Sequence, residues 1–123
     1  MANPNIINAT SILGKTVFDL DVSNTATKLL ENAASSGKII KINSLTIANI
    51  DRTNAADITV TIRNAGGATT YSYLTNTVSV PEDATLVVIS KDTAIYLEED
   101  MSIYLQASAA GDLSATCSYE EIS

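Results

Sequence analysis

The chain has 123 residues, with 14 acidic and 7 basic side chains and a net charge of −7. This length suits a single domain with a sizeable hydrophobic core, while the shortage of positive charge argues against a nucleic-acid partner. Histidine is absent from the sequence. The usual base of neutral-pH catalysis and the commonest metal ligand are therefore missing, so we expect no enzyme, no cofactor, no metal and no small-molecule substrate.

The residue usage favours strands joined by polar turns. The sequence holds 15 Thr, 13 Ser and 10 Asn among many Val and Ile, a mixture typical of β-proteins. The single cysteine, Cys117, cannot form an intrachain disulfide and lies in a strand-like run, so we expect a buried, unreactive thiol. No stretch approaches the length of a membrane span and no signal-like pattern opens the chain, so we expect neither a membrane partner nor an export route.

The first residues show weak periodicity and carry three Asn and one Pro within MANPNIINATSI. We expect residues 1–13 to form an N-terminal arm that is ordered where it docks, for example on a neighbouring subunit. Residues 14–123 are expected to form one β-domain. The candidate interface residues of the arm are Asn3, Pro4, Ile6 and Ile7.

Residues 16–22 alternate, with Phe18, Leu20 and Val22 on one face and acidic side chains on the other. This pattern predicts a strand whose acidic residues face solvent. Residues 26–34 fit either a short amphipathic helix or a strand that leads into a turn, and the strand is preferred because of the Thr-rich start and the Ser-Ser-Gly end.

The clearest strand pattern lies in residues 38–63, which we interpret as two long strands joined by a polar turn at Asp51–Asn54 and paired as an antiparallel hairpin. The second strand alternates cleanly. In the first strand the apolar parity slips at Asn43–Ser44, which predicts a β-bulge that returns the apolar side chains to one face. Burial of this strand on both faces is the alternative. The apolar positions are Ile40, Ile42, Leu45, Ile47, Ile58, Val60 and Ile62.

The rest of the chain predicts further short strands separated by turns. Asn64–Gly67 and Pro81–Asp83 are turn signals, because paired glycines accept positive φ and proline cannot donate to a strand ladder. Residues 86–89 form a continuous apolar run that suits a strand buried on both sides. The expected strands are 70–74, 76–80, 86–89, 93–97, 102–108 and 113–119. About eight or nine strands with regular turns predict an antiparallel all-β sandwich or barrel.

One dense group of carboxylates, Glu98-Glu99-Asp100, is the candidate cation site, with help from Asp92 or Asp112. Three consecutive acids point in different directions and lack the alternating oxygen ligands of a calcium loop, so we prefer a solvated turn. A small hydrolase that uses Glu98 or Asp112 is the enzymatic alternative. A turn is a poor place for the buried, perturbed carboxylate that such an enzyme needs.

Two pairs of tyrosines are candidate surface groups. Tyr96 and Tyr104 have the parity opposite to their apolar neighbours, so they would be cross-strand neighbours if residues 93–97 pair with residues 102–108. Tyr71 and Tyr73 share one face of their strand. Packing within a sheet or at a subunit interface is preferred over a ligand platform, because tyrosine is enriched at interfaces.

Two segments carry a resemblance to a known family: GKIIKINSLTIANIDRTNAADITVTI and VPEDATLVVISKDTAIYLEEDMSIYLQASAAGDLSATCSYEEIS. Together with the opening MANPNI, they resemble small virion structural proteins of tailed phages, particularly marine cyanophages. The resemblance covers nearly the whole chain and implies a jelly-roll-like β-sandwich displayed in many copies on the virion after synthesis in the host cytoplasm. One departure lies at Asp100-Met101, where the family pattern has a Gly-Asp turn.

The resemblance leaves two virion functions open. As a capsid decoration (cement) protein, the chain would form homo-oligomers, trimers being the expected number, and bind the major capsid protein to stabilise the shell. As a neck, tail or baseplate component it would instead join other virion proteins. From another class, a carbohydrate-binding module of a phage fibre would use the paired tyrosines as its platform.

Overall fold

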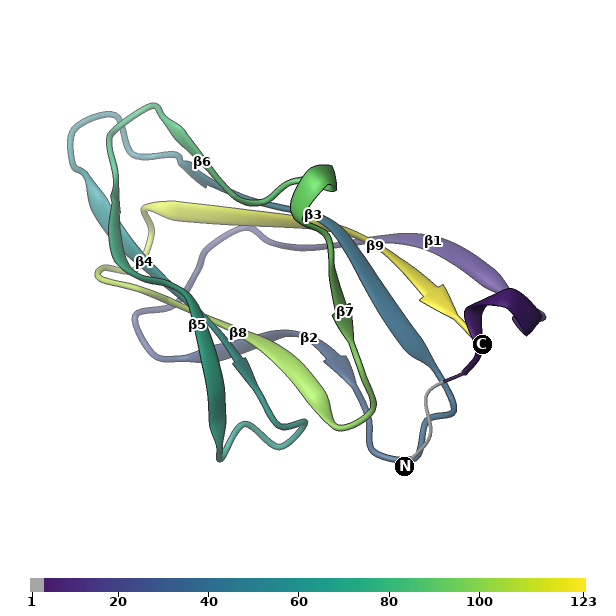
Figure 1. Ribbon diagram of the computed structural model, residues 1–123. Coiled ribbons are helices and arrows are strands. Elements are labelled where there is room, and N and C mark those ends of the chain that lie inside the picture. Colours follow the sequence, from purple (N-terminus) through teal and green to yellow (C-terminus); the bar gives the residue numbers. More distant parts are fainter. Residues whose placement is uncertain (1–3) are drawn as a thin grey trace.

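Two antiparallel sheets stack face to face in the computed structural model, which describes residues 4–123 (Figure 1). One sheet has five strands in the order β1-β9-β3-β6, with β7 also paired to β3, and the other has four strands in the order β2-β8-β4-β5. The strands are β1 (Ile12–Asp19), β2 (Thr27–Asn32), β3 (Ile39–Asn49), β4 (Ala56–Arg63), β5 (Thr70–Val80), β6 (Thr85–Ile89), β7 (Ile95–Leu97), β8 (Met101–Ala107) and β9 (Leu113–Ile122). Two 3-10 turns, η1 (Ile6–Asn8) and η2 (Lys91–Thr93), complete the elements.

This strand order is that of a jelly roll, so the predicted fold class, an all-β sandwich of about nine strands, is confirmed. Most connections cross from one sheet to the other, and only β4 to β5 and β6 to β7 stay within a sheet. Such crossing places strands that are far apart in sequence side by side, as β1 is with β9 over the full length of β1. No helix among residues 4–123 is long and apolar enough to cross a bilayer.

The core lies between the sheets and follows the alternation of the strands. Ile58 and Val60 of β4 are fully buried, as the period of two requires for one face of a half-buried strand. The predicted bulge is confirmed, because the pairing of β3 with β9 shifts register between Ile42 and Ser44. Ile42 and Leu45 on its two sides are both fully buried. The extra residue thus keeps both halves of β3 directed into one core.

The predicted hairpin of residues 38–63 is wrong, because β3 lies in the five-stranded sheet and β4 in the four-stranded sheet. Their apolar rows meet across the core and are not neighbours in one layer. Asn49, at the end of β3, ties the crossing: its side-chain amide donates to the carbonyl oxygens of Asn54 and Val80, both at 2.9 Å. The polar turn predicted at Asp51–Asn54 is present, but it connects the two sheets and does not join neighbouring strands of one sheet.

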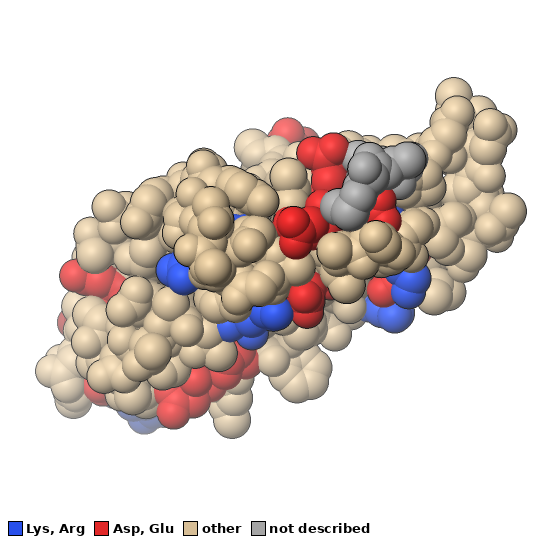
Figure 2. Space-filling view, turned by 90° about the horizontal axis from the view of Figure 1, so that it is seen from below, with Lys and Arg blue, Asp and Glu red and all other residues tan. Residues whose placement is uncertain are grey.

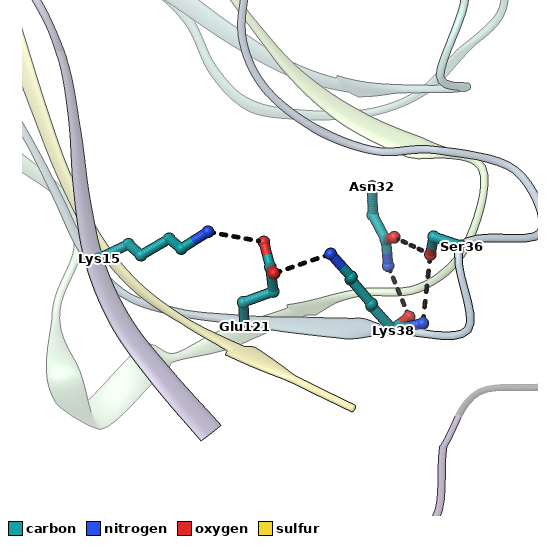
Figure 3. A network of polar contacts seen from close by, with 5 residues as sticks. All are labelled: Lys15, Asn32, Ser36, Lys38 and Glu121. Atoms are coloured by element: carbon teal, nitrogen blue, oxygen red, sulfur yellow. Dashed lines mark hydrogen bonds and ion pairs between the residues drawn. The ribbon is translucent and has the colours of Figure 1, made fainter. Parts of the chain in front are cut away.

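A second buried asparagine holds the opposite corner. Asn32, at the end of β2, donates to the carbonyl oxygens of Lys38 and Leu97, each at 2.9 Å, and accepts from the Ser36 hydroxyl. Figure 3 shows this corner beside Glu121, which lies between Lys15 of β1 and Lys38. The ammonium groups of Lys38 and Lys15 donate hydrogen bonds to the Glu121 carboxylate. These bonds, chiefly the one from Lys38, lower the pKa of the Glu121 carboxyl. Both corners therefore satisfy polar backbone that would otherwise be buried without partners.

Two expectations of burial are wrong, and each concerns an edge strand. Phe18 and Leu20 are 72% and 73% exposed, while Val17 packs on the core. The strand ends at Asp19, and the chain turns before Val22, which is buried as expected. Residues 86–89 are not buried on both sides, because β6 is the last strand on its path and Val87 is 56% exposed.

Two other segments settle alternatives that the sequence left open. Residues 27–32 form strand β2, which confirms the strand over the helix. Residues 70–80 form one strand, β5, where two short strands were expected. Its register against β4 shifts between Ile58 and Val60, which pair with Val78 and Thr75. Asn76 and Thr77 together therefore oppose a single residue of β4, which is a β-bulge that bends the strand without ending it.

The described part of the N-terminal segment folds back onto the end of the same chain. The Asn5 side chain caps η1, and the backbone N–H groups of Thr10 and Ser11 donate to the carbonyl oxygen of Ser123. Strand β1 begins at Ile12, so the last two residues of the expected arm are part of the sandwich. The expected interface residue Asn3 lies outside the described residues.

Candidate functional site

The outer face of the four-stranded sheet carries a polar groove. Since Ile58 and Val60 point into the core, the alternate residues of β4 point outward and form the floor. The groove has a volume of about 250 Å³. Its lining residues are Asp57, Thr59, Thr61 and Arg63 from β4, Tyr73, Asn76 and Thr77 from β5, and Gln106, Ala107 and Ser108 from β8 and the residue after it.

Registered pairs explain why these side chains meet. Thr59 is opposite Gln106 on β8, and Thr61 is opposite Tyr73 on β5. The bulge brings Asn76 and Thr77 beside Thr59, whose hydroxyl accepts a hydrogen bond of 3.0 Å from the Thr77 backbone N–H. The groove is therefore built from neighbouring strands of one sheet and needs no flexible loop to form it.

Arg63 closes one end of the groove and is held there. Its Nε donates to the Thr61 hydroxyl at 3.0 Å, and one terminal nitrogen donates to the carbonyl oxygen of Gly67. The guanidinium carbon lies 4.7 Å from the centre of the Tyr104 ring, a distance typical of a cation–π contact. Gly67 has a φ of +83°, and a Cβ there would collide with this ring. Tyr104 thus packs under the β4–β5 turn.

A second surface feature is an apolar row on the outer face of the five-stranded sheet. Phe18 pairs with Thr116, Thr116 with Thr46, and Thr46 with Val87. These four residues, which we call the apolar row, cross four strands in register. Phe18 and Val87 are exposed at its two ends, with Thr methyl and hydroxyl groups between them. The row gives this sheet a partly apolar surface.

The predicted tyrosine positions fall in different places. Tyr96 is on β7 and pairs with Lys41 in the five-stranded sheet, whereas Tyr104 is on β8 in the four-stranded sheet. The expected cross-strand pair is therefore wrong, because β7 and β8 do not pair, and the two rings cannot form one platform. Tyr71 and Tyr73 are both exposed on β5, and of the two only Tyr73 lines the groove.

The remaining candidate interface residues belong to the N-terminal segment. Ile7 is 91% exposed and Ile6 is 43% exposed, both within η1, while Pro4 is half-buried. These side chains are attached to a segment whose backbone is bound to Ser123. The segment therefore presents isoleucines beside the C-terminus of its own chain (Figure 1).

The acidic turn at Glu98–Asp100 is engaged with backbone groups. The Glu99 carboxylate accepts from the N–H of Gly37 at 2.8 Å, and the Asp100 carboxylate accepts from the N–H of Ala65. Asp100 has a φ of +64°, the conformation for which glycine is favoured. Within residues 4–123 no group of three or more Asp, Glu or Cys side chains is arranged to hold a metal ion.

Three acids gather near the start of β9. Asp21 accepts from the Gly111 N–H at 2.7 Å. The pKa of Asp51 is lowered to about 2, chiefly by the backbone N–H of Thr53. The pKa of Asp112 is raised by desolvation first, and then by the hydrogen bond and the charge of Asp51 and the charge of Asp21. Asp112 therefore holds its proton to higher pH than an isolated aspartate.

The thiol is buried, as its place in a strand-like run predicts, and the surface charges in Figure 2 are of mixed sign. Cys117 is 1% exposed, and burial raises the pKa of its thiol to about 12. The thiolate that reacts with electrophiles is thus scarce at neutral pH. On the face shown in Figure 2, Lys and Arg side chains are interspersed with acidic ones and form no continuous basic patch among the described residues.

Comparisons with known proteins support the fold. No protein-family model and no curated protein sequence matches the chain. Among solved structures, one from work on Bacillus endospore appendages, described as a novel family of disulfide-linked pili, is similar with a TM-score of 0.54 and 13% identity. The match covers 100% of this chain and 96% of the other. At this identity the likeness shows a shared β-sandwich fold and does not show a shared function.

Sequence reasoning identified some groove residues but not the groove. Tyr73 was singled out for its face, and the outward parity of Thr59, Thr61 and Arg63 follows from the alternation of β4. Asn76 and Thr77 were missed, since the expected break between residues 74 and 76 hid the bulge. One signal could have revealed the bulge. No turn residue separates the two expected short strands, and one bulged strand explains that pattern better.

Proposed function

We propose that this chain is a non-catalytic structural protein of a tailed-phage virion, and that it acts as a capsid decoration protein that binds the major capsid protein. The observation that carries the proposal is the apolar row, from Phe18 to Val87, on the outer face of the five-stranded sheet. The resemblance of two long segments of the sequence to small virion proteins supplies the virion context. The confirmed jelly-roll sandwich is compatible with that context.

The apolar row has the form of a protein-binding surface. Phe18 is 72% exposed and Val87 is 56% exposed, on the two outer strands of the row. With strands about 4.8 Å apart, the row extends roughly 14 Å across the sheet. Exposed apolar groups arranged in this way lose contact with water when a partner covers them, and this is the main driving force of association.

A row of this size gives weak binding by a single copy. Decoration solves this by multiplicity, because a subunit that contacts several neighbours at once gains effective concentration for each contact. Homo-oligomerisation, which we propose to give a trimer, would add to this effect and would cover strand edges that otherwise recruit other chains. Ile6 and Ile7 are the exposed apolar groups that the N-terminal segment would contribute.

The structurally similar pilus protein offers one parallel and one contrast. A β-sandwich of this kind occurs there in an assembly, namely disulfide-linked pili. In this chain the one cysteine is in the core, so the proposed contacts are non-covalent. The assembly proposed here would therefore be resistant to reducing agents and sensitive to changes that weaken apolar contacts.

Quantitative mass spectrometry of purified virions tests the proposal. Hundreds of copies per particle are expected for a decoration protein, and a dozen or fewer would place the protein in the neck, tail or baseplate. Its absence from purified virions would overturn the virion assignment. Particles made without the protein are expected to lose DNA at lower temperature or after milder osmotic shock than complete particles.

The surface itself is tested by adding purified protein back to those particles. The double variant Phe18→Ser with Val87→Ser is expected to bind at least tenfold more weakly than the original protein. The matched control is Tyr71→Ser with Val78→Ser, which removes two exposed apolar side chains from β5 in the other sheet. Equal loss in both double variants would show that the apolar row is not the contact surface.

A further inference from the structure

The bulge beside the polar groove holds an unusual backbone conformation. Thr77 lies within strand β5 and has a φ of +50°. The other described non-glycine residues with positive φ lie in turns, namely Ser35, Asp83 and Asp100. For a β-branched residue this conformation is an outlier. Such strain persists only where surrounding contacts enforce it, and it gathers at functional sites. Here the hydrogen bond from the Thr77 N–H to the Thr59 hydroxyl enforces it.

The side chains along the groove offer both donors and acceptors. Asp57 is an acceptor, Arg63 is a donor, and Thr59, Asn76 and Gln106 can do both. Gln106 is oriented by its own amide, which donates to the carbonyl oxygen of Asn24 at 3.1 Å and leaves the amide oxygen as an acceptor. Such a set matches a ligand that presents many hydroxyl groups, because each hydroxyl is also donor and acceptor.

The groove is narrow and long. Asp57 and Arg63 lie six positions apart on β4, which is roughly 20 Å of extended strand. A volume of about 250 Å³ is below the range of about 300–1,000 Å³ that drug-sized ligands occupy. A thin trough of this length fits a linear chain of small units. Tyr73, which is 58% exposed, gives the trough one aromatic wall on which a sugar ring can stack.

Other linear ligands fit less well. A peptide is usually held either by an open strand edge or by apolar pockets for its side chains, but the floor strand β4 is paired on both sides, with β5 and β8. A nucleic acid needs clustered positive charge, and the net charge is −7. An acidic glycan would meet Asp57 at one end of the groove. A neutral glycan carries no such penalty.

We infer that the polar groove on the outer face of β4, β5 and β8 binds a neutral oligosaccharide, with Tyr73 as the stacking residue and Thr59, Asn76 and Gln106 as hydrogen-bonding residues. This site lies on the sheet opposite to the apolar row. The inference therefore does not depend on the proposed decoration function. In a protein bound to the shell through the apolar row, the groove would face away from the shell.

Titration of the ¹⁵N-labelled full chain tests the inference. The probes are three neutral tetrasaccharides: α-1,4-linked glucose, β-1,4-linked glucose and β-1,4-linked N-acetylglucosamine. At least one is expected to shift the amide signals of Thr59, Asn76 and Gln106 in a saturable manner. Shifts confined to other parts of the protein, or no shift with any of the three at 10 mM, would overturn the inference.

A pair of variants separates stacking from general effects on β5. Tyr73→Ala is expected to weaken binding at least tenfold. Tyr71 is similarly exposed, lies two residues away and is outside the groove, so Tyr71→Ala is expected to stay within twofold. Equal binding by Tyr73→Ala and the original chain would contradict the assignment.

A synthetic peptide of residues 1–13 is the competing probe. Saturable shifts of the groove amides by this peptide and by none of the sugars would overturn the inference and identify a protein-docking site.

Discussion

The two outer faces of the sandwich differ although the same core supports both. The outer face of the five-stranded sheet carries the apolar row, in which Phe18, Thr116, Thr46 and Val87 pair from strand to strand, although the register of β3 against β6 shifts just before Thr46. The outer face of the four-stranded sheet is interrupted at Thr77, where β5 bulges and a polar groove opens. The five-stranded sheet thus presents a partly apolar surface suited to another protein, whereas the four-stranded sheet, in which the register of β5 against β4 shifts at three places, presents a concave polar surface suited to a smaller ligand.

This difference shows where the constraints of the fold apply. The inner faces must fill the space between the sheets with apolar side chains, so both sheets obey the same rule there. The outer faces are free of that rule, and hydrogen bonding within each sheet alone decides their shape. Changes in the core are therefore expected to affect both sheets together, while changes on an outer face affect only its own binding surface.

The largest effect is expected from a cavity in the shared core. Leu45→Ala and Ile58→Ala each remove a fully buried side chain, one from each sheet, and each is expected to lower the free energy of unfolding by about 2–5 kcal/mol. Val87→Ala on the outer face is the control, with an expected change of about 0.5 kcal/mol or less. Urea unfolding followed by circular dichroism measures all three. A similar loss of stability for Val87→Ala would mean that the outer face is as tightly constrained by packing as the core.

The next largest effect is expected at the two corners. Asn32→Ala and Asn49→Ala each leave two carbonyl oxygens without their donors, at a cost of roughly 1–3 kcal/mol for each variant. Asn8→Ala, at an exposed position, serves as the control and should change stability little. Equal stability of the two corner variants and the original protein would show that the corners do not join the sheets.

A smaller effect of opposite sign is expected at the bulge. Thr77→Gly removes the steric penalty of a left-handed residue, about 1–2 kcal/mol, and adds the entropy cost of glycine, roughly 0.5–1 kcal/mol. The net result is a gain of up to about 1.5 kcal/mol in the free energy of unfolding. Thr75→Gly in the same strand, which has no positive φ, is expected to lose stability. A loss in both variants would refute strain at Thr77.

The smallest effect concerns the partly exposed acids near β9 and depends on pH. Because the pKa of Asp112 is raised in the folded protein, its ionisation favours unfolding, and stability falls as pH rises from the unfolded value of 3.8 through the folded one. Asp112→Asn is therefore expected to raise the melting temperature at pH 7 and to lose this advantage below pH 3.8. Asp51 acts in the opposite sense, since its lowered pKa of about 2 gives stability that is present above 3.8 and lost as pH falls towards 2.

Thermal melts at pH 7 and pH 3 measure this effect. Glu82→Gln removes the same charge from the exposed turn after β5 and controls for net charge. If both substitutions raise the melting temperature equally at pH 7, the cause is the overall charge of −7 and not the contact between Asp51 and Asp112.

Several features of the fold could be predicted from local pattern. The alternation of Ile58 and Val60 identified β4 and its buried face, because a period of two belongs to strands alone. The parity slip at Asn43–Ser44 identified the bulge of β3, since one inserted residue is the simplest way to return a strand to its core. The same reasoning failed at Phe18, where the alternating run extends past the point at which the strand ends.

Which strands pair was beyond the sequence. An apolar face on β3 and one on β4 are equally consistent with neighbours in one sheet and with partners across the core, because both arrangements bury the same side chains. The placement of Tyr96 and Tyr104 in separate sheets follows from that choice. The polar groove depends on it too, since it needs β4 between β8 and β5.

The sequence by itself determined that this chain is a set of strands with polar turns, which residues of β4 face the core, and that its one cysteine is buried, because each of these follows from the properties of neighbouring residues. Only the tertiary structure decided the jelly-roll order, the crossing at Asn49, the apolar row and the bulged groove. These features depend on hydrogen bonds between residues that are distant in sequence, and many pairings of distant strands satisfy one local pattern.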